Sequence, residues 1–140
     1  MTTQQLNKIL QPYWEEGWDG YCRFDDGWAD LVHECHLNIL EIDPKYKINQ
    51  IKEKFGVLRF YYQNDPEIES NKIDDIIQKY ELKSASTCEM CAQKGYLCKK
   101  KYWLKTLCFE CSSKLGFEKN EKIINVDSYL SNGYRKDDNH

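Results

Sequence analysis

The sequence lacks any apolar run long enough to cross a membrane. A membrane-spanning helix needs about 20 consecutive apolar residues, and no segment of the 140 residues approaches that length. The first ten residues are polar and amphipathic, so we also expect no secretory leader. These two absences favour a cytoplasmic protein, in the cytoplasm of the host cell if the chain is phage-encoded.

Recognisable catalytic motifs are missing too. The chain contains no phosphate-cradling glycine loop, no nucleophile elbow and no metalloprotease motif. An excess of positive charge is also lacking: 23 acidic residues outnumber 20 basic ones, and the formal net charge of −3 gives no global attraction to nucleic acid. Apolar residues at 41% and charged residues at 31% are typical of a soluble globular protein. Together these features predict a non-enzymatic globular protein.

Cysteine, in contrast, is plentiful, with seven residues. Two Cys-x-x-Cys pairs, Cys88/Cys91 and Cys108/Cys111, are separated by sixteen residues, which is the spacing of a Cys₄ zinc site. Four thiolates close the coordination shell, so we expect one structural Zn²⁺ rather than a catalytic one. Disulfides or a redox Cys-x-x-Cys are the alternatives, and a reducing compartment disfavours disulfides.

Three cysteines remain outside these pairs: Cys22, Cys35 and Cys98. We expect them to be free thiols, which again favours a cytoplasmic setting.

The spacing of apolar residues predicts three helices. Apolar side chains recur on one helical face in residues 2–16, 27–41 and 65–83. Asp26 is placed to cap the second helix. The third opens on Asp65-Pro66, with proline at the first helical position.

Between the second and third helices the apolar period changes to that of strands. Residues 45–63 contain an alternating strand pattern after Gly56, which predicts a hairpin. Residues 96–98 and 103–107 predict two further paired strands between the cysteine pairs, and a short helix is expected after Cys111, through Leu115 to Gly116. The expected fold class is therefore α+β, with three helices packed on a small antiparallel hairpin or sheet and a Cys₄ zinc ribbon.

This pattern also predicts the domain organisation. Residues 1–83 would form a core of helices and the hairpin, and residues 84–117 the zinc ribbon. Residues 118–140 would form a C-terminal tail that is partly disordered.

Four motifs occur together between residues 22 and 111: Gly27-Trp28, the Cys88/Cys91 pair, and two longer segments. Residues 52–61 read Lys-Glu-Lys-Phe-Gly-Val-Leu-Arg-Phe-Tyr, and residues 103–108 read Trp-Leu-Lys-Thr-Leu-Cys. As a set they resemble a family of small uncharacterised bacterial and phage-borne zinc-ribbon proteins. The resemblance implies a zinc knuckle and an origin in phage or mobile-element neighbourhoods.

The hairpin segment carries a candidate ligand site. Lys52, Lys54 and Arg59 lie close to the predicted turn, with Tyr61 nearby. Arg59 could grip a phosphate or carboxylate bidentately while Tyr61 supplies a hydroxyl or a stacking face. The alternative is a solvated strand edge whose charges resist aggregation.

A Gly- and Asp-rich loop contributes the aromatic residues Trp18, Tyr21 and Trp28. We expect these side chains and the Lys52–Tyr62 hairpin to form a surface that binds a protein partner, because interfaces concentrate aromatic and arginine anchors. The preferred function is thus an accessory or inhibitory protein, of an anti-defence or immunity type, in a phage–host conflict. A binder of an anionic small molecule, such as a nucleotide signal, is the first alternative.

A second cationic segment lies between the cysteine pairs. Lysines 94, 99, 100, 101 and 105 are interleaved with aromatic residues, and no acid occurs in residues 92–106. This composition suits single-stranded nucleic acid, since lysines follow phosphates and aromatic rings stack on bases. The alternative, favoured by the acidic character of the whole chain, is that the lysines balance the thiolates and keep a hairpin tip soluble.

Two histidines, His33 and His36, stand three residues apart on the second predicted helix. With Cys22 they could bind a second metal ion. The simpler alternative is that one or both are polar groups on the surface of the helix.

Overall fold

The computed structural model describes residues 1–120, which form a mixed α+β protein. The elements are α1 (Thr3–Leu10), α2 (Ala29–Ile42), β1 (Lys47–Lys54), β2 (Val57–Gln63), α3 (Asn71–Ser84), β3 (Tyr96–Lys100), β4 (Trp103–Leu107), α4 (Phe109–Leu115) and β5 (Glu118–Lys119). Short 3₁₀ helices span Gln11–Tyr13 and Asp26–Trp28. The predicted number of three α-helices is wrong, because α4 adds a fourth within these residues. The predicted C-terminal tail lies outside the described residues except for residues 118–120.

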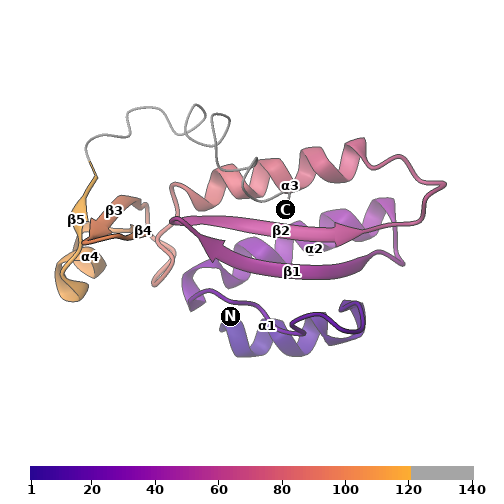
Figure 1. Cartoon of the computed structure of the whole chain (residues 1–140), viewed down its shortest axis with the longest axis horizontal. Helices are drawn as coiled ribbons and strands as arrows, with labels where there is room; N and C mark the ends of the chain where they lie inside the picture. The colour runs from indigo at the N-terminus through magenta and orange to yellow at the C-terminus, as the bar shows by residue number, and fades with distance from the viewer. Residues whose placement is uncertain (121–140) are drawn as a thin grey trace.

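The molecule has two parts that lie along its long axis (Figure 1). In the larger part, the helix–hairpin core, α1 and α3 flank the β1–β2 hairpin and α2 lies behind it. The smaller part, residues 86–120, carries both cysteine pairs and lies at one end; we call it the cysteine unit. None of the helices in residues 1–120 has the length and apolar character that a membrane crossing requires.

Side chains from α1, α2, β1, β2 and α3 pack together at the centre of the core. They are fully or almost fully buried, and they include Leu6, Leu10, Trp28, Val32, Ile39, Ile48, Ile51, Leu58, Phe60, Ile73 and Ile77. The apolar stripes predicted for the helices therefore face one another across the hairpin.

The β1–β2 hairpin is antiparallel, as predicted, and places Lys52 opposite Arg59 and Ile51 opposite Phe60. Its turn is formed by Phe55 and Gly56, whose φ angles are 56° and 88°. Glycine adopts this left-handed conformation without steric penalty, so Gly56 suits the second turn position.

Both outer edges of this two-stranded sheet are covered. The loop after α1 lies along β1: Arg23 donates its backbone N–H to Ile51 O (3.0 Å), and Glu53 donates to Arg23 O (2.9 Å). Exposed strand edges invite pairing with other chains, and here the protein's own loop occupies the edge.

The β2 edge is covered by side chains of α3. Ser84 Oγ accepts the backbone N–H of Leu58 (2.9 Å), and Glu81 accepts that of Phe60 (3.3 Å). Ser84 is fully buried and donates in turn to Glu81 O. The two side chains satisfy backbone donors that a further strand would otherwise pair with.

We expect Ser84→Ala to destabilise the protein by about 1–3 kcal/mol, because the buried N–H of Leu58 loses its acceptor. Chemical denaturation of the purified variant would measure the change. Ser86→Ala is the matched control, since Ser86 lies just after α3 but is exposed. Equal stabilities for the two variants would contradict this role of Ser84.

Two predicted helix starts are wrong. α3 begins at Asn71, not at Asp65, because Asp65 forms a separate turn in which it accepts the N–H of Glu67 (2.9 Å) through its side chain. Asp26 does not cap α2; its side chain accepts the N–H of Thr3 (2.8 Å) and ties α1 to the start of the second helix.

Candidate metal centre

The four predicted ligands, Cys88, Cys91, Cys108 and Cys111, come together in the cysteine unit. Their sulfur atoms all lie within 4.8 Å of one another, and Cys91 Sγ is 3.6 Å from Cys108 Sγ. All four are free thiols. Within residues 1–120 they form the one group of metal-ligating side chains close enough to hold an ion.

The first cysteine pair lies on a tight turn. Cys88 donates its N–H to Gln93 O (2.7 Å), and Ala92, with φ of 71°, donates to Cys88 O (2.9 Å). Gly95 passes so close that a Cβ atom there would lie 2.9 Å from Cys88 N. The turn thus needs a residue without a side chain at position 95.

The second pair lies at the start of a helix rather than on a second turn between strands. Cys108 caps α4, and its Sγ accepts the N–H of Cys111 (3.4 Å). This hydrogen bond lowers the pKa of Cys108 to about 7. A thiolate is the form of cysteine that binds metal, so the helix start prepares Cys108 as a ligand.

The candidate metal centre is tied to the core by a partly buried group of charged side chains. Lys105 lies between Asp25 (3.1 Å) and Glu89 (3.3 Å). Glu89 directly follows the ligand Cys88, is only 1% exposed, and also accepts the backbone N–H of Asp25 (3.0 Å). Burial raises the pKa of Glu89 to about 7, although Lys105 opposes this shift. Lys105 therefore serves inside the protein and does not belong to an exposed cationic patch.

Gly27 and Trp28 complete the junction. A Cβ atom on Gly27 would lie 2.2 Å from Cys88 O and 2.5 Å from Glu89 O. Gly27 donates its N–H to Glu89 O (2.7 Å), and Trp28 Nε1 donates to Thr87 O (2.8 Å). The backbone of the first cysteine turn thus lies directly against the start of the second helix.

This arrangement corrects the prediction that Trp28 lies on a contact surface, since it is completely buried. Its large ring fills the space between core and cysteine unit. Trp18 and Tyr21, from the same acidic loop, do lie on the surface, with exposed fractions of 54% and 48%.

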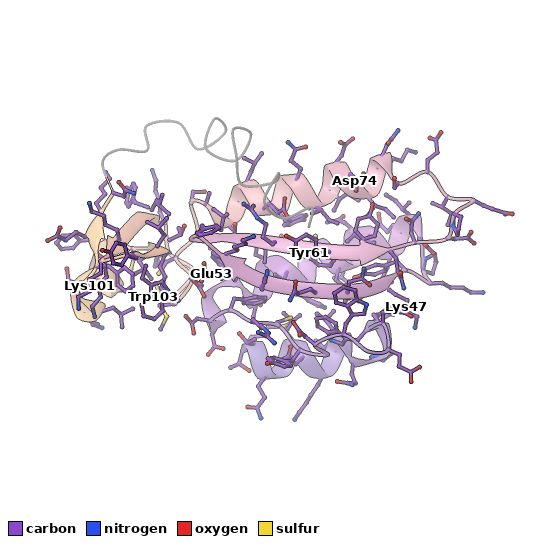
Figure 2. The ribbon with its side chains drawn as sticks, in the orientation of Figure 1. Lys47, Glu53, Tyr61, Asp74, Lys101 and Trp103 are labelled. Atoms are coloured by element: carbon purple, nitrogen blue, oxygen red, sulfur yellow. The ribbon has the colours of Figure 1, made fainter. Side chains whose placement is uncertain are left out.

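The residues predicted to form an anion site on the hairpin do not all reach the surface. Arg59 lies opposite Lys52 but is just 1% exposed, so it is not open to solvent as an anion-gripping side chain. Lys52, Lys54 and Tyr61 are half-buried. Figure 2 shows Tyr61 at the middle of β2, well away from Trp103 and Lys101 on the cysteine unit.

The histidines do not form a second metal site with Cys22 among the described residues. His36 is buried, its Nδ1 is hydrogen-bonded to Tyr46 Oη, and the ring of Tyr13 packs edge-on against it. Burial lowers the pKa of His36 to about 4. It is a neutral core residue at pH 7, not a polar group on the helix surface.

The three remaining cysteines are buried free thiols, as predicted. Burial raises the pKa of Cys22 to about 12 and also raises that of Cys35 and Cys98. Inert thiols of this kind are packing residues.

Exposed aromatic side chains gather on the cysteine unit. They are Tyr96 (41% exposed), Tyr102 (fully exposed), Trp103 (56%) and Phe109 (79%). The first three are the aromatic residues that the sequence interleaves with lysines, whereas Phe109, directly after the candidate ligand Cys108, was not among the predicted contact residues. Its position at the first residue of a short helix was the missing information.

Comparisons with known proteins give no relative for this arrangement. No protein family, no curated protein and no solved structure matches the chain. Any function must therefore be argued from the site itself.

Proposed function

We propose that the protein is a non-catalytic binding protein whose cysteine unit folds around one structural zinc ion. The observation that carries this proposal is the cluster of four sulfur atoms within 4.8 Å of one another. Tetrahedral zinc with Zn–S bonds of about 2.3 Å holds its sulfurs about 3.8 Å apart, close to the 3.6 Å between Cys91 and Cys108.

A closed set of four thiolates also bears on catalysis. Zinc that activates water keeps one coordination position open for it. Four cysteines would occupy all four positions of a tetrahedral zinc ion. The metal's role in this proposal is to hold the cysteine unit in shape. The unit then presents its exposed lysines and aromatic rings to a partner.

The exposed aromatic residues favour the cysteine unit as the contact surface. Of the contact residues predicted on the core, Trp28 and Arg59 are buried. The alternative of a binder of an anionic small molecule depends on Arg59, and the burial of this side chain argues against it. An accessory or inhibitory role in a phage–host conflict stays a prediction.

Metal analysis of the purified protein tests the proposal. We expect one zinc ion per chain, released in proportion when a thiol reagent modifies four cysteines. Protein free of metal, or intact-mass data that show the four sulfurs joined as disulfides, would overturn it. Iron in place of zinc would replace the metal but keep the four-cysteine site, since tetrahedral sulfur sites accept either.

A further inference from the structure

We propose that the exposed end of the cysteine unit binds single-stranded nucleic acid. The inference deepens the proposed function, on which it rests, by naming the class of partner. It depends on three features of the unit: the exposure of the β3–β4 hairpin tip, the local charge, and the pairing of lysines with aromatic rings.

The hairpin tip is fully presented to solvent. All five residues from Lys99 to Trp103 are exposed, in the order Lys-Lys-Lys-Tyr-Trp. Tyr102 makes no ring contact with other described residues and is fully exposed, and Trp103 is 56% exposed. Large rings held open to water in this way supply faces on which unpaired bases can stack.

Charge is distributed very unevenly along the chain. The cysteine unit, residues 86–120, contains seven lysines and three glutamates, a formal excess of four positive charges, whereas the whole chain carries −3 and the rest of it therefore −7. A zinc ion held by four thiolates would reduce the excess of the unit to two. Among the described residues, Lys105 is the one lysine of the seven that lies within ion-pairing distance of a carboxylate. Six lysines of the cysteine unit thus keep their charge available to phosphates.

Lysines also surround the aromatic rings. Lys119 and Lys94 lie 4.5 Å and 5.7 Å from the ring centre of Tyr96, and Lys100 stands opposite Trp103 in the strand register. An unpaired base on Tyr96 would therefore have an ammonium group beside it for the adjoining phosphate, whereas the ammonium of Lys100 donates to Leu115 O (2.9 Å). The rings of Tyr96 and Trp103 lie four residue pairs apart along the hairpin, about 13 Å at the rise of a β-strand. One single-stranded nucleic acid could therefore contact both rings.

The site suits an unpaired strand better than a duplex. Bases in a duplex are stacked on one another, so exposed rings gain little from them, whereas single strands offer free base faces. The acidic core does not favour nucleic acid, but the cysteine unit lies at one end of the molecule, with Lys101 at its tip (Figures 1 and 2). Screening limits repulsion between exposed charges to about 10 Å at ordinary salt.

The backbone of the tip provides a clean variant. Lys101 has φ of 56°, a conformation that glycine adopts more easily than lysine. Lys101→Gly removes the charge and keeps the turn, and Tyr102→Ser removes a ring that packs against nothing described. The double variant Lys101→Gly/Tyr102→Ser should thus keep the fold and the metal.

Fluorescence anisotropy of the full zinc-loaded chain with labelled single strands tests the proposal. The probes are an oligothymidylate, an oligouridylate and a DNA duplex, each of about 20 nucleotides or base pairs so that a single site fits. We expect the wild-type chain to bind the single strands more tightly than the duplex. Affinity should fall with salt, with a slope of log K against log [salt] of about −2 if three phosphates are contacted. The tighter of the two single strands identifies DNA or RNA as the ligand.

The double variant should weaken binding about tenfold or more and reduce the salt slope by about 0.7. Lys45→Gln/Tyr21→Ser is the matched control, because it also removes one exposed lysine and one exposed tyrosine, from the core. Zinc-loaded protein that binds no single strand, or whose binding is unchanged in the double variant, overturns this inference and leaves the proposed function intact. Absence of metal overturns the proposed function itself.

Discussion

Replacing Cys88 by alanine, or removing the metal with a chelator, is expected to unfold the cysteine unit while the helix–hairpin core stays folded. The unit has little else to hold it: its buried cluster consists of Cys88, Cys98, Leu107, Cys108 and Phe117, of which two are candidate metal ligands. Segments shorter than about 40 residues usually need metals or disulfides to fold. Structural zinc supplies about 10 kcal/mol or more of binding free energy in such units.

Hydrogen exchange would measure this effect residue by residue. Amide protons of β3, β4 and α4 should lose protection in Cys88→Ala, while those in the middle of α2 and α3 keep theirs. Cys98→Ala is the control, because Cys98 is buried in the same cluster but is not a predicted ligand. Protection of β3 and β4 that survives chelation would show that the unit folds without metal.

Gly27→Ala is expected to have the second largest effect, although it adds a single methyl group. That group would lie 2.2 Å and 2.5 Å from backbone oxygens of Cys88 and Glu89, and backbone cannot yield as a flexible side chain can. Overpacking of this kind destabilises by about 3 kcal/mol. The shift would also separate the first cysteine turn from the core, so we expect weaker zinc retention in competition with a chromogenic chelator.

Gly17→Ala distinguishes this contact from a general effect of replacing glycine in the loop. Gly17 has nothing within 4 Å of the added atom, but its φ is 90°, so the cost should be about 1 kcal/mol and come from backbone strain alone. Unfolding in denaturant compares the two variants. If Gly27→Ala were as stable as Gly17→Ala and held zinc equally well, the close contact would not matter.

Local patterns in the sequence were enough for the cysteine cluster and the hairpins. The spacing of Cys88, Cys91, Cys108 and Cys111 has few other physical explanations, and strand alternation around Gly56 depends on neighbouring residues only. The free state of Cys22, Cys35 and Cys98 also followed from counting. All of these depend on short-range chemistry.

The burial of Trp28 and Arg59 could not be foreseen in the same way. Trp28 follows a loop rich in glycine and acids, where aromatic side chains are often exposed, and Arg59 carries a charge that normally stays in solvent. Trp28 packs into the core cluster, and its buried indole N–H donates to Thr87 O, 59 residues further along the chain. Contacts across such a separation leave no periodic pattern, and the whole junction around Gly27 was missed for this reason.

A short helix was expected after Cys111, but its start at Phe109 was missed, because Cys-x-x-Cys is compatible with two local structures. Two residues between the cysteines fit a tight turn, as at Cys88, and equally the first turn of a helix, as at Cys108. Asp65 was misjudged through a similar ambiguity, since Asp-Pro opens both turns and helices. Only tertiary context decides between them.

The packing of Gly27 and Trp28 against residues 87–89 has a consequence for synthesis on the ribosome. A chain that emerges from its N-terminus exposes α1 and the start of α2 long before Thr87 and Glu89 leave the exit tunnel. Thr87 O, which accepts the indole N–H, and the backbone of Cys88 and Glu89 beside Gly27 are thus absent until more than half of the polypeptide has been made. The contacts of Gly27 and Trp28 with residues 87–89 can therefore form only after these later residues have emerged.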